Sequence, residues 1–166
     1  DYIFILNPDA KFENNSFDKF INILINKNFS IAAPFDLHDA KKINFNGTEL
    51  IDTDSVKGFA MLLNKNFFDD FFDENFFLYL EEIDLCLRTK KNKGTILLVN
   101  APVVHLGGAS HGDKDDIEME KSRNWHWMWS KFYFNKKHYG YFFGLIKTLP
   151  NFIKSFFKYI FYKLLS

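Results

Sequence analysis

Cysteine, net charge and long apolar runs are all scarce in this chain, and each shortage excludes a class of protein. A single cysteine, Cys86, leaves no disulfide framework and no paired-thiol metal site. The formal net charge is zero, with 21 basic and 21 acidic residues, so the overall balance does not suggest a nucleic-acid partner. No uninterrupted apolar run approaches the roughly 18 to 20 residues that a membrane-spanning helix needs.

The apolar sequence that is present predicts a folded domain of the α/β class. The 166 residues are 47% hydrophobic, which suffices for one domain with a core. An apolar run at residues 2–6, closed by Asn7-Pro8-Asp9, predicts a buried strand that delivers Asp9 to the edge of a sheet. A helix is expected from Ser16, a good N-cap. Its inner face would consist of Phe17, Phe20, Ile21, Leu24 and Ile25.

The middle of the chain predicts further strands. Residues 30–33 form the next strand, which we expect Pro34 to end, and Asn46-Gly47 predicts a hairpin turn between 43–45 and 49–51. A strand is expected at VKGFAMLL (residues 56–63), where Gly58 allows a ligand or another backbone to approach closely. Beyond it we expect a short helix near 66–71, a helix C-cap at Gly94, and strands at 95–99 and 103–105.

In the stretch FFLYLEEIDLCLR, from Phe76 to Arg88, a run of aromatic residues is followed by the start of a predicted helix. The first turn of this helix carries Glu81, Glu82 and Asp84. Apolar residues at helical spacing face inward, so the acids face a surface or a cleft. Two interpretations follow from the residues alone. The acids either complement the positive end of the helix dipole or belong to a functional site.

The last part of the chain differs in composition. Residues 115–138 predict a helix, and from Tyr139 onward lysines and aromatic residues occur without any acid. Pro150 is placed to begin an amphipathic helix with Lys154 and Lys158 on one side, and with Phe152, Phe156, Ile160 and Leu164 on the other. We expect this helix to lie on an anionic membrane surface, and the alternative is that it docks on the domain itself.

Four segments in order carry a resemblance to a known family: LNPDA (6–10), VKGFAMLL (56–63), FDENFFLYLEEIDLCLR (72–88) and APVVHLGGAS (101–110). This succession closely resembles the family 2 glycosyltransferases of the GT-A fold, in particular the rhamnosyltransferase-like members. The resemblance implies an α/β, partial GT-A fold, with a mixed sheet flanked by helices and a C-terminal helical extension. Residues 1–112 would be the C-terminal part of the catalytic domain, 113–138 the helical extension, and 139–166 the membrane-surface helix.

In that family the LNPD segment lies midway through the catalytic domain. The resemblance therefore implies that the N-terminal nucleotide-binding part is missing and that this chain by itself binds donor poorly or not at all. It also implies a metal site. Asp9 and Asn7 match a variant of the family's metal-binding Asp-x-Asp motif, and His105 matches a histidine that completes the site in related enzymes. The implied ion is Mn²⁺ or Mg²⁺, held against the donor diphosphate.

The resemblance assigns catalysis to the acidic stretch. Glu82 falls where the family usually has the Asp that removes a proton from the acceptor hydroxyl, and Glu81 matches the acid before it. Leu80 departs from the family's frequent glycine, and Asp84 matches a recurrent acid with either a helix-start role or acceptor contacts. Further implied substrate contacts are Gly58, Gly107, Gly108, Ser110 and Arg123, the last as a partner for the donor diphosphate.

The implied function is inverting transfer of a sugar to a hydroxyl of a glycan or glycolipid in bacterial surface polysaccharide synthesis. The implied donor is a nucleotide-diphosphate sugar such as dTDP-rhamnose or a UDP-sugar, and no nucleic acid is expected as a partner. The enzyme would be cytoplasmic and peripheral on the inner face of the cell membrane. The alternative is a catalytically inactive GT-A-like binding module at the membrane, and a metal-dependent hydrolase is a more distant third interpretation.

Overall fold

The computed structural model describes residues 1–106 and 116–165, with side chains described for 1–106 and 119–161. The chain divides into two compact units, residues 1–72 with 82–110 and residues 73–81 with 111–166. The described helices and strands are β1 (Tyr2–Leu6), β2 (Ala10–Phe12), α1 (Ser16–Leu24), β3 (Ile31–Asp36), the 3-10 turn η1 (Leu37–Asp39), β4 (Leu50–Asp52), β5 (Ala60–Asn64), the 3-10 turn η2 (Lys65–Phe67), α2 (Glu81–Lys91), β6 (Ile96–His105), α3 (Asp116–Tyr139) and α4 (Tyr141–Leu165).

The first unit is built on one mixed sheet. Within the described residues the strand order is β1-β5-β3-β6-β2, and β4 pairs with the free edge of β6 beside β2. Strands β3 and β6 run parallel, whereas β1, β2, β4 and β5 each pair antiparallel with their neighbours. The predicted α/β class with a mixed sheet and flanking helices is therefore confirmed.

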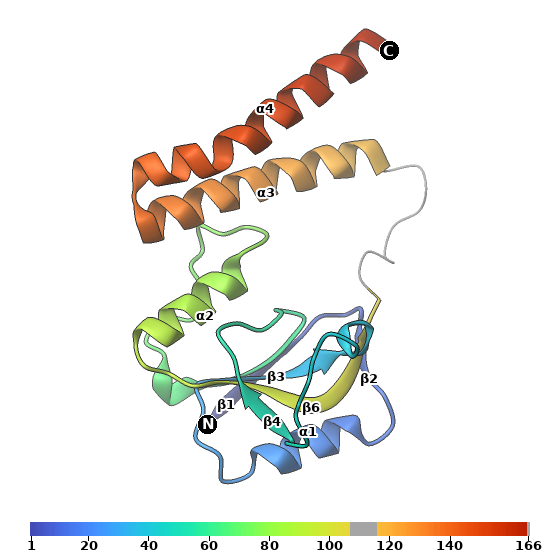
Figure 1. Cartoon of the computed structure of the whole chain (residues 1–166), viewed down its shortest axis with the longest axis vertical. Coiled ribbons are helices and arrows are strands. Elements are labelled where there is room, and N and C mark those ends of the chain that lie inside the picture. Colours follow the sequence, from blue (N-terminus) through green and yellow to red (C-terminus); the bar gives the residue numbers. More distant parts are fainter. Residues whose placement is uncertain (107–115, 166) are drawn as a thin grey trace. The chain divides into compact units, whose positions relative to one another are not determined.

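Helices cover both faces of this sheet (Figure 1). Alternate residues of the strands point to opposite faces, so Ala32 and Leu97 pack with α1 while Ile31 and Ile96 pack with α2. Helix α1 contributes Phe20 and Leu24 to the core of its face. Helix α2 contributes Leu85 and Cys86 to the other face. Because the central strands are buried on both sides, they are nearly continuous runs of apolar residues.

Several predicted strand boundaries are wrong. Pro34 does not end its strand, because β3 continues to Asp36 through a register shift between Pro34 and Phe35 that accommodates the missing N–H. Residues 43–45 do not form the first arm of a hairpin, although the turn at Asn46-Gly47 exists, because β4 pairs with β6 instead. The two short strands expected at 95–99 and 103–105 are one strand, β6.

Helix boundaries also differ from the prediction. Helix α1 ends at Leu24, so Ile25 lies outside it, and Phe17 and Ile21 keep 41% and 36% of their surface exposed. The Ser16 side chain does not cap the helix; its Oγ donates to the Pro102 carbonyl at 2.5 Å. Pro150 lies inside α4 rather than at its start, which leaves the Ile146 carbonyl without its helical hydrogen bond.

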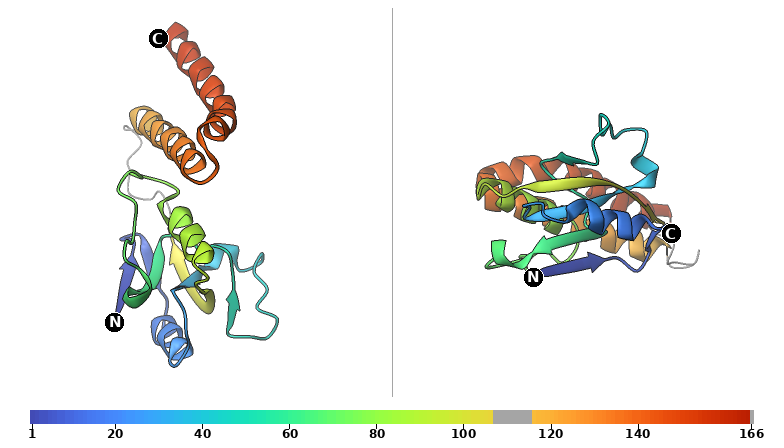
Figure 2. Two further views of the ribbon diagram at one scale, coloured as in Figure 1. Left: turned by 90° about the vertical axis from the view of Figure 1, so that its left-hand side faces the viewer. Right: turned by 90° about the horizontal axis from the view of Figure 1, so that it is seen from below.

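The second unit consists of helices α3 and α4 and the loop 73–81, and Figure 2 shows the two helices side by side near their connecting turn. The loop is held on α3 by hydrogen bonds from the Ser130 hydroxyl to the Leu78 carbonyl (2.6 Å) and from the Tyr133 hydroxyl to Asp73 (2.9 Å). Lys137 adds an ion pair to Asp73 at 2.7 Å. Among the described residues, no helix combines the length and apolar character needed to cross a membrane.

The Asp73 cluster predicts a pH-dependent stability of the second unit. Burial opposes ionisation of Asp73, but hydrogen bonds from Lys137, Asn75 and Tyr133 outweigh it and hold the pKa of Asp73 below its ordinary value of 3.8. A depressed carboxyl pKa contributes stability above the unfolded-state pKa, and this contribution is lost as the pH falls through the folded-state pKa. We expect Asp73→Asn to lower the free energy of unfolding at neutral pH by about 1–3 kcal/mol.

The measurement is thermal unfolding followed by circular dichroism at a series of pH values. The difference between the natural chain and Asp73→Asn should shrink below pH 3.8. The neighbouring exposed acid provides the control, since Glu74→Gln should change little at any pH. A difference between Asp73→Asn and the natural chain that does not vary with pH would contradict the assignment.

Candidate functional site

Asp9 and His105 form a pair at one end of the sheet. The chain turns after β1 at Asn7-Pro8, where the Asn7 N–H donates to the Phe59 carbonyl (2.8 Å) and the Ala10 N–H donates to the Asn7 carbonyl (3.1 Å). Strand β2 then pairs with β6 so that Ala10 lies opposite His105. This register brings Asp9 Oδ1 to 3.3 Å from His105 Nε2, with both side chains about three-quarters buried.

The carboxylate oxygen and imidazole nitrogen of this pair are suitable ligands for a divalent cation that also binds a diphosphate. Two ligands on adjacent vertices of an octahedral ion lie roughly 3 Å apart, which is close to the observed separation of 3.3 Å. Imidazole with carboxylate suits Mn²⁺ better than Mg²⁺. In the part of the chain whose side chains are described, no three His, Cys, Asp or Glu residues gather into a site. The remaining ligands of an ion held here would have to be phosphate oxygens and water.

Glu82 lies against the segment that also supports His105. It stands in the first turn of α2, and a Cβ added at Gly58 would lie 3.2 Å from the Glu82 Cβ. The next residue, Phe59, stacks on the His105 ring with a centroid separation of 4.8 Å and an interplanar angle of 17°. Gly58 and Phe59 therefore contact the candidate base and the candidate metal ligand at consecutive positions. A side chain at position 58 would crowd the Glu82 side chain, so the close contact requires glycine or a small shift of Glu82.

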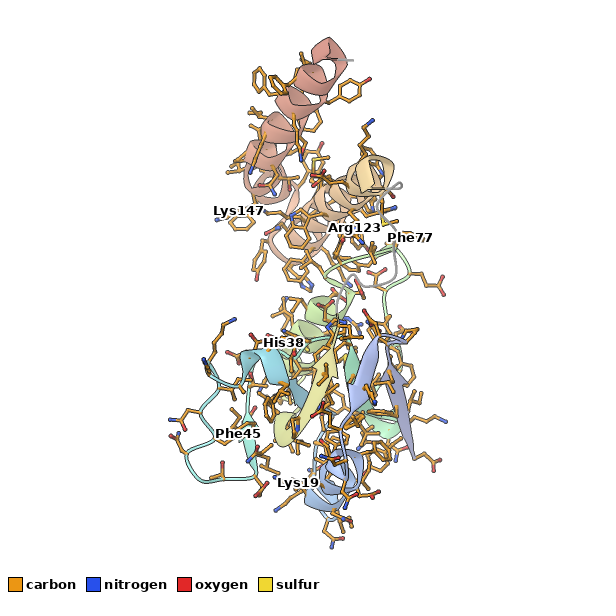
Figure 3. All side chains as sticks on the ribbon, turned by 90° about the vertical axis from the view of Figure 1, so that its right-hand side faces the viewer. Lys19, His38, Phe45, Phe77, Arg123 and Lys147 are labelled. Atoms are coloured by element: carbon orange, nitrogen blue, oxygen red, sulfur yellow. The ribbon has the colours of Figure 1, made fainter. Side chains whose placement is uncertain are left out.

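A pocket of about 200 Å³ opens beside Glu82. Most of its lining surface is apolar, and its polar lining residues are Glu82, Asp36, Asp39, Ser55 and Lys57. Lys57 Nζ bridges two carboxylates, at 2.9 Å from Asp36 Oδ2 and 2.6 Å from Asp39 Oδ2. Figure 3 labels His38 on η1, whose Nδ1 lies 3.0 Å from Asp36 Oδ1. A lysine therefore stands at the wall of the pocket with its charge balanced by neighbouring carboxylates.

This charge network shifts the pKa of each of its central members. Burial raises the pKa of Asp36, but hydrogen bonds from Lys57 and His38 outweigh this effect, so the pKa lies below its ordinary value. Hydrogen bonds from Lys42 and Lys57 lower the pKa of Asp39 to about 2. Burial lowers the pKa of Lys57, and its hydrogen bonds to both carboxylates outweigh that effect and raise the pKa. All three groups are therefore charged at neutral pH.

Sequence analysis missed this network and the Phe59 stacking. Asp36 and Asp39 follow the end of a buried strand, a position at which open sheets place functional residues, but the excursion after them looked like an ordinary polar loop. The partner, Lys57, is 21 residues from Asp36, so no local spacing signals their pairing. Its position directly before Gly58 is the one feature of the sequence that could have drawn attention to Lys57.

Two residues before α2 adopt left-handed backbone conformations, with φ of 71° at Tyr79 and 68° at Leu80. A non-glycine residue in this region costs roughly 1–2 kcal/mol, which explains why a glycine is favourable at the position of Leu80. The Tyr79 ring packs edge-on against Trp127 at 5.6 Å. Glu81 follows as the first residue of α2, and one of its carboxylate oxygens is buried without a hydrogen-bond partner among the described atoms.

Asp84 is fully buried and pairs with a residue of its own helix. Its Oδ2 accepts a hydrogen bond from Arg88 Nε at 2.8 Å, one turn later in α2. Arg88 also donates to the carbonyls of Asp70, at 3.0 Å, and Phe71. A carboxylate enclosed in this way cannot reach an acceptor, so of the two predicted roles the structural one fits.

The other predicted site residues lie apart or outside the described region. Asn7 is exposed at the turn after β1, next to Asp9 in the chain. Arg123 is exposed on α3 in the second unit. Gly107, Gly108 and Ser110 fall outside the described residues. The structure thus brings together Asp9 with His105, and Glu82 with Gly58, around the Gly58-Phe59 segment.

A scan of the chain against protein-family models finds no match, and a search of curated proteins likewise finds none.

The buried Asp84–Arg88 pair predicts a large stability effect. Arg88→Ala leaves a buried carboxylate without its charged partner, so we expect the free energy of unfolding to fall by about 3–5 kcal/mol. Lys90→Ala is the matched control on the same helix, because the partner of Lys90, Asp52, is largely exposed and such pairs contribute only about 0–1 kcal/mol. Urea unfolding followed by circular dichroism measures both. Equal costs for the two substitutions would contradict the assigned role of Arg88.

Proposed function

We propose that this chain is the C-terminal part of an inverting glycosyltransferase of family 2, with a GT-A fold. It transfers a sugar from a nucleotide-diphosphate donor, such as dTDP-rhamnose or a UDP-sugar, to a hydroxyl of a glycan or lipid-linked acceptor. The setting is bacterial surface polysaccharide synthesis at the inner face of the cell membrane. The sequence resemblance supports this proposal, together with one observation from the structure.

That observation is the arrangement around Gly58 and Phe59. The candidate general base, Glu82, packs against Gly58, and the candidate metal ligand, His105, stacks on Phe59. An inverting transfer needs a base on one side of the reacting sugar carbon and a charge-stabilising group at the leaving diphosphate on the other. Two adjacent residues that each support one of these groups favour a single reaction site over two unrelated surface features.

The pocket beside Glu82 supports the proposal as a candidate acceptor site. Its mixture of apolar and polar lining residues is typical of sites that bind the faces and hydroxyls of a sugar ring. Glu82 is one of the residues that line this pocket, which supports its proposed role as the acceptor of a proton from a bound hydroxyl. Lys57, held by Asp36 and Asp39, is a fixed part of the lining and would position hydroxyl groups of the acceptor through hydrogen bonds.

Asp9 and His105 are the residues that would hold Mn²⁺ or Mg²⁺. The ion would neutralise charge on the departing nucleoside diphosphate. The chain's own contribution is to orient the two ligands: the β2–β6 register fixes Asp9 opposite the end of β6, and Phe59 fixes the plane of the His105 ring.

A second candidate function is a GT-A-like binding module without catalysis. It is favoured by the direct contact of Asp9 with His105, which lets the two side chains interact with each other instead of with an ion, and by the strained Leu80 where the family frequently has glycine. The experiments below separate the two functions.

Sugar transfer tests the role assigned to Glu82. With Mn²⁺ and a panel of nucleotide sugars, we expect Glu82→Gln to lower the transfer rate roughly 10²- to 10⁴-fold, because an amide cannot accept the proton. Glu82→Asp should retain most activity, since the resemblance implies aspartate at this position. The assay uses the full-length gene product. If Glu82→Gln transfers sugar as fast as the natural enzyme, or if no nucleotide sugar is turned over at all, the transferase proposal fails.

Metal binding tests the Asp9–His105 pair without relying on activity. Titration of Mn²⁺ in the presence of a nucleoside diphosphate, followed by electron paramagnetic resonance, should give an affinity that falls roughly tenfold or more in Asp9→Ala and in His105→Ala. The chain offers a matched control, because His38 and Asp36 form another histidine–carboxylate pair at 3.0 Å. His38→Ala should leave the Mn²⁺ affinity unchanged. Equal effects at both pairs would overturn the assignment and favour the binding module.

A further inference from the structure

Helix α4 carries a stripe of apolar side chains that is exposed to solvent along the described length of the helix. At 100° per residue, six positions fall within a narrow sector of the helix surface. We call this set the outer stripe: Phe142, Ile146, Leu149, Ile153, Phe157 and Ile160. Phe142 is 79% exposed, Ile146 69% and Phe157 64%. Exposure on this scale along one helix face is typical of a surface that contacts another molecule.

The opposite face of α4 packs on α3, so the outer stripe is not the surface between the two helices. A Cβ added at Gly144 would lie 3.1 Å from the Lys136 N and 3.2 Å from the Phe132 carbonyl oxygen, which marks the closest approach. Farther along, Phe152 and Phe156 line an apolar groove against Trp125 of α3. Both phenylalanines line this groove and remain about half exposed, so they border the outer stripe on the side of α3.

Charges on α4 indicate the kind of surface that the outer stripe fits. The chain has no acidic residue from Tyr139 to its end, and lysines occur at 147, 154, 158 and 163. Lys158 pairs with Glu120 of α3. Lys147 and Lys154 fall on one border of the outer stripe, and Figure 3 shows Lys147 on the outside of the helix pair, where its Nζ lies 5.3 Å from the centre of the Phe143 ring. Long lysine side chains beside an apolar stripe can reach lipid phosphates while their methylenes contact acyl chains.

We propose that the outer stripe of α4 inserts into the interfacial region of an anionic lipid bilayer, with Lys147 and Lys154 contacting the phosphate groups. The helix would lie parallel to the surface, as amphipathic helices with an apolar face and lysines at its border do. Basic residues near such a surface each add attraction to anionic lipid. This proposal rests on α4 alone and does not depend on the transferase activity.

Vesicle sedimentation with the whole 166-residue chain is the experiment. Vesicles of phosphatidylcholine with phosphatidylglycerol should retain the chain, and the double variant Ile146→Asn with Phe157→Asn should bind roughly 10- to 100-fold more weakly. The matched control is Leu6→Asn with Ile25→Asn, which changes two apolar side chains of the first unit that are 44% and 56% exposed. The control should bind as the natural chain does. Circular dichroism verifies that each variant is folded.

Electrostatic dependence is tested in the same assay. Lys147→Gln with Lys154→Gln should weaken binding to the anionic vesicles roughly fivefold for each lysine and should leave the weak binding to pure phosphatidylcholine unchanged. The exposed lysines 11 and 27 provide the control pair, and their change to glutamine should have little effect. Equal losses in the two lysine pairs would overturn the proposed orientation.

A probe attached at single positions tests the orientation without removing the stripe. An environment-sensitive fluorophore at Ile146→Cys should become brighter and blue-shifted on vesicle addition, whereas the same probe at Ser155→Cys, which lines the groove beside α3, should not. A response at position 155 alone would overturn the proposal. A stripe variant that converts a dimer to a monomer and binds vesicles normally would overturn it in favour of contact with a second copy of the chain.

Discussion

Strand β6 is the constraint on which the first unit depends. It pairs in parallel with β3 along one edge, and its other edge receives β4 at the start and β2 at the end. Its side chains contribute to the cores beneath both α1 and α2. Because β6 ends at His105 and β2 begins directly after Asp9, the strand register that builds the sheet also sets the separation of the candidate metal ligands.

The candidate base depends on a different set of contacts. Buried Asp84 orients Arg88, and Arg88 binds the backbone of the preceding loop, so α2 is anchored where it meets the sheet. The chain enters the helix through two left-handed residues, whose backbone strain the surrounding contacts must offset. Glu82 can then pack against Gly58 because that residue has no side chain. Rigid support for a few charged groups is what a reaction site requires.

In the second unit, helix α3 makes two sets of contacts. One set holds the loop 73–81 through Ser130, Tyr133 and Lys137, and the other packs against α4. Once α4 has used one face for α3, a contiguous apolar stripe remains on its outside. Two interacting helices cannot bury a surface that is apolar over most of its circumference, so the remaining face needs another apolar environment. The lysines beside the stripe, and the lack of acidic residues from Tyr139 onward, favour the anionic lipid surface that we propose.

The α/β class, the strand at 2–6, the acidic helix from Glu81 and the helical end of the chain could all be predicted from the amino-acid sequence, because they follow from local apolar periodicity and turn residues. The sequence also singled out Asp9, Glu82 and His105. It did not predict the Lys57 bridge to Asp36 and Asp39, the Phe59 stacking, or the burial of Asp84. It also misjudged the positions of Pro34 and Pro150, which lie inside a strand and a helix. These features follow from the packing of segments that are far apart in the chain, and pairing between residues tens of positions apart leaves no local pattern in the sequence.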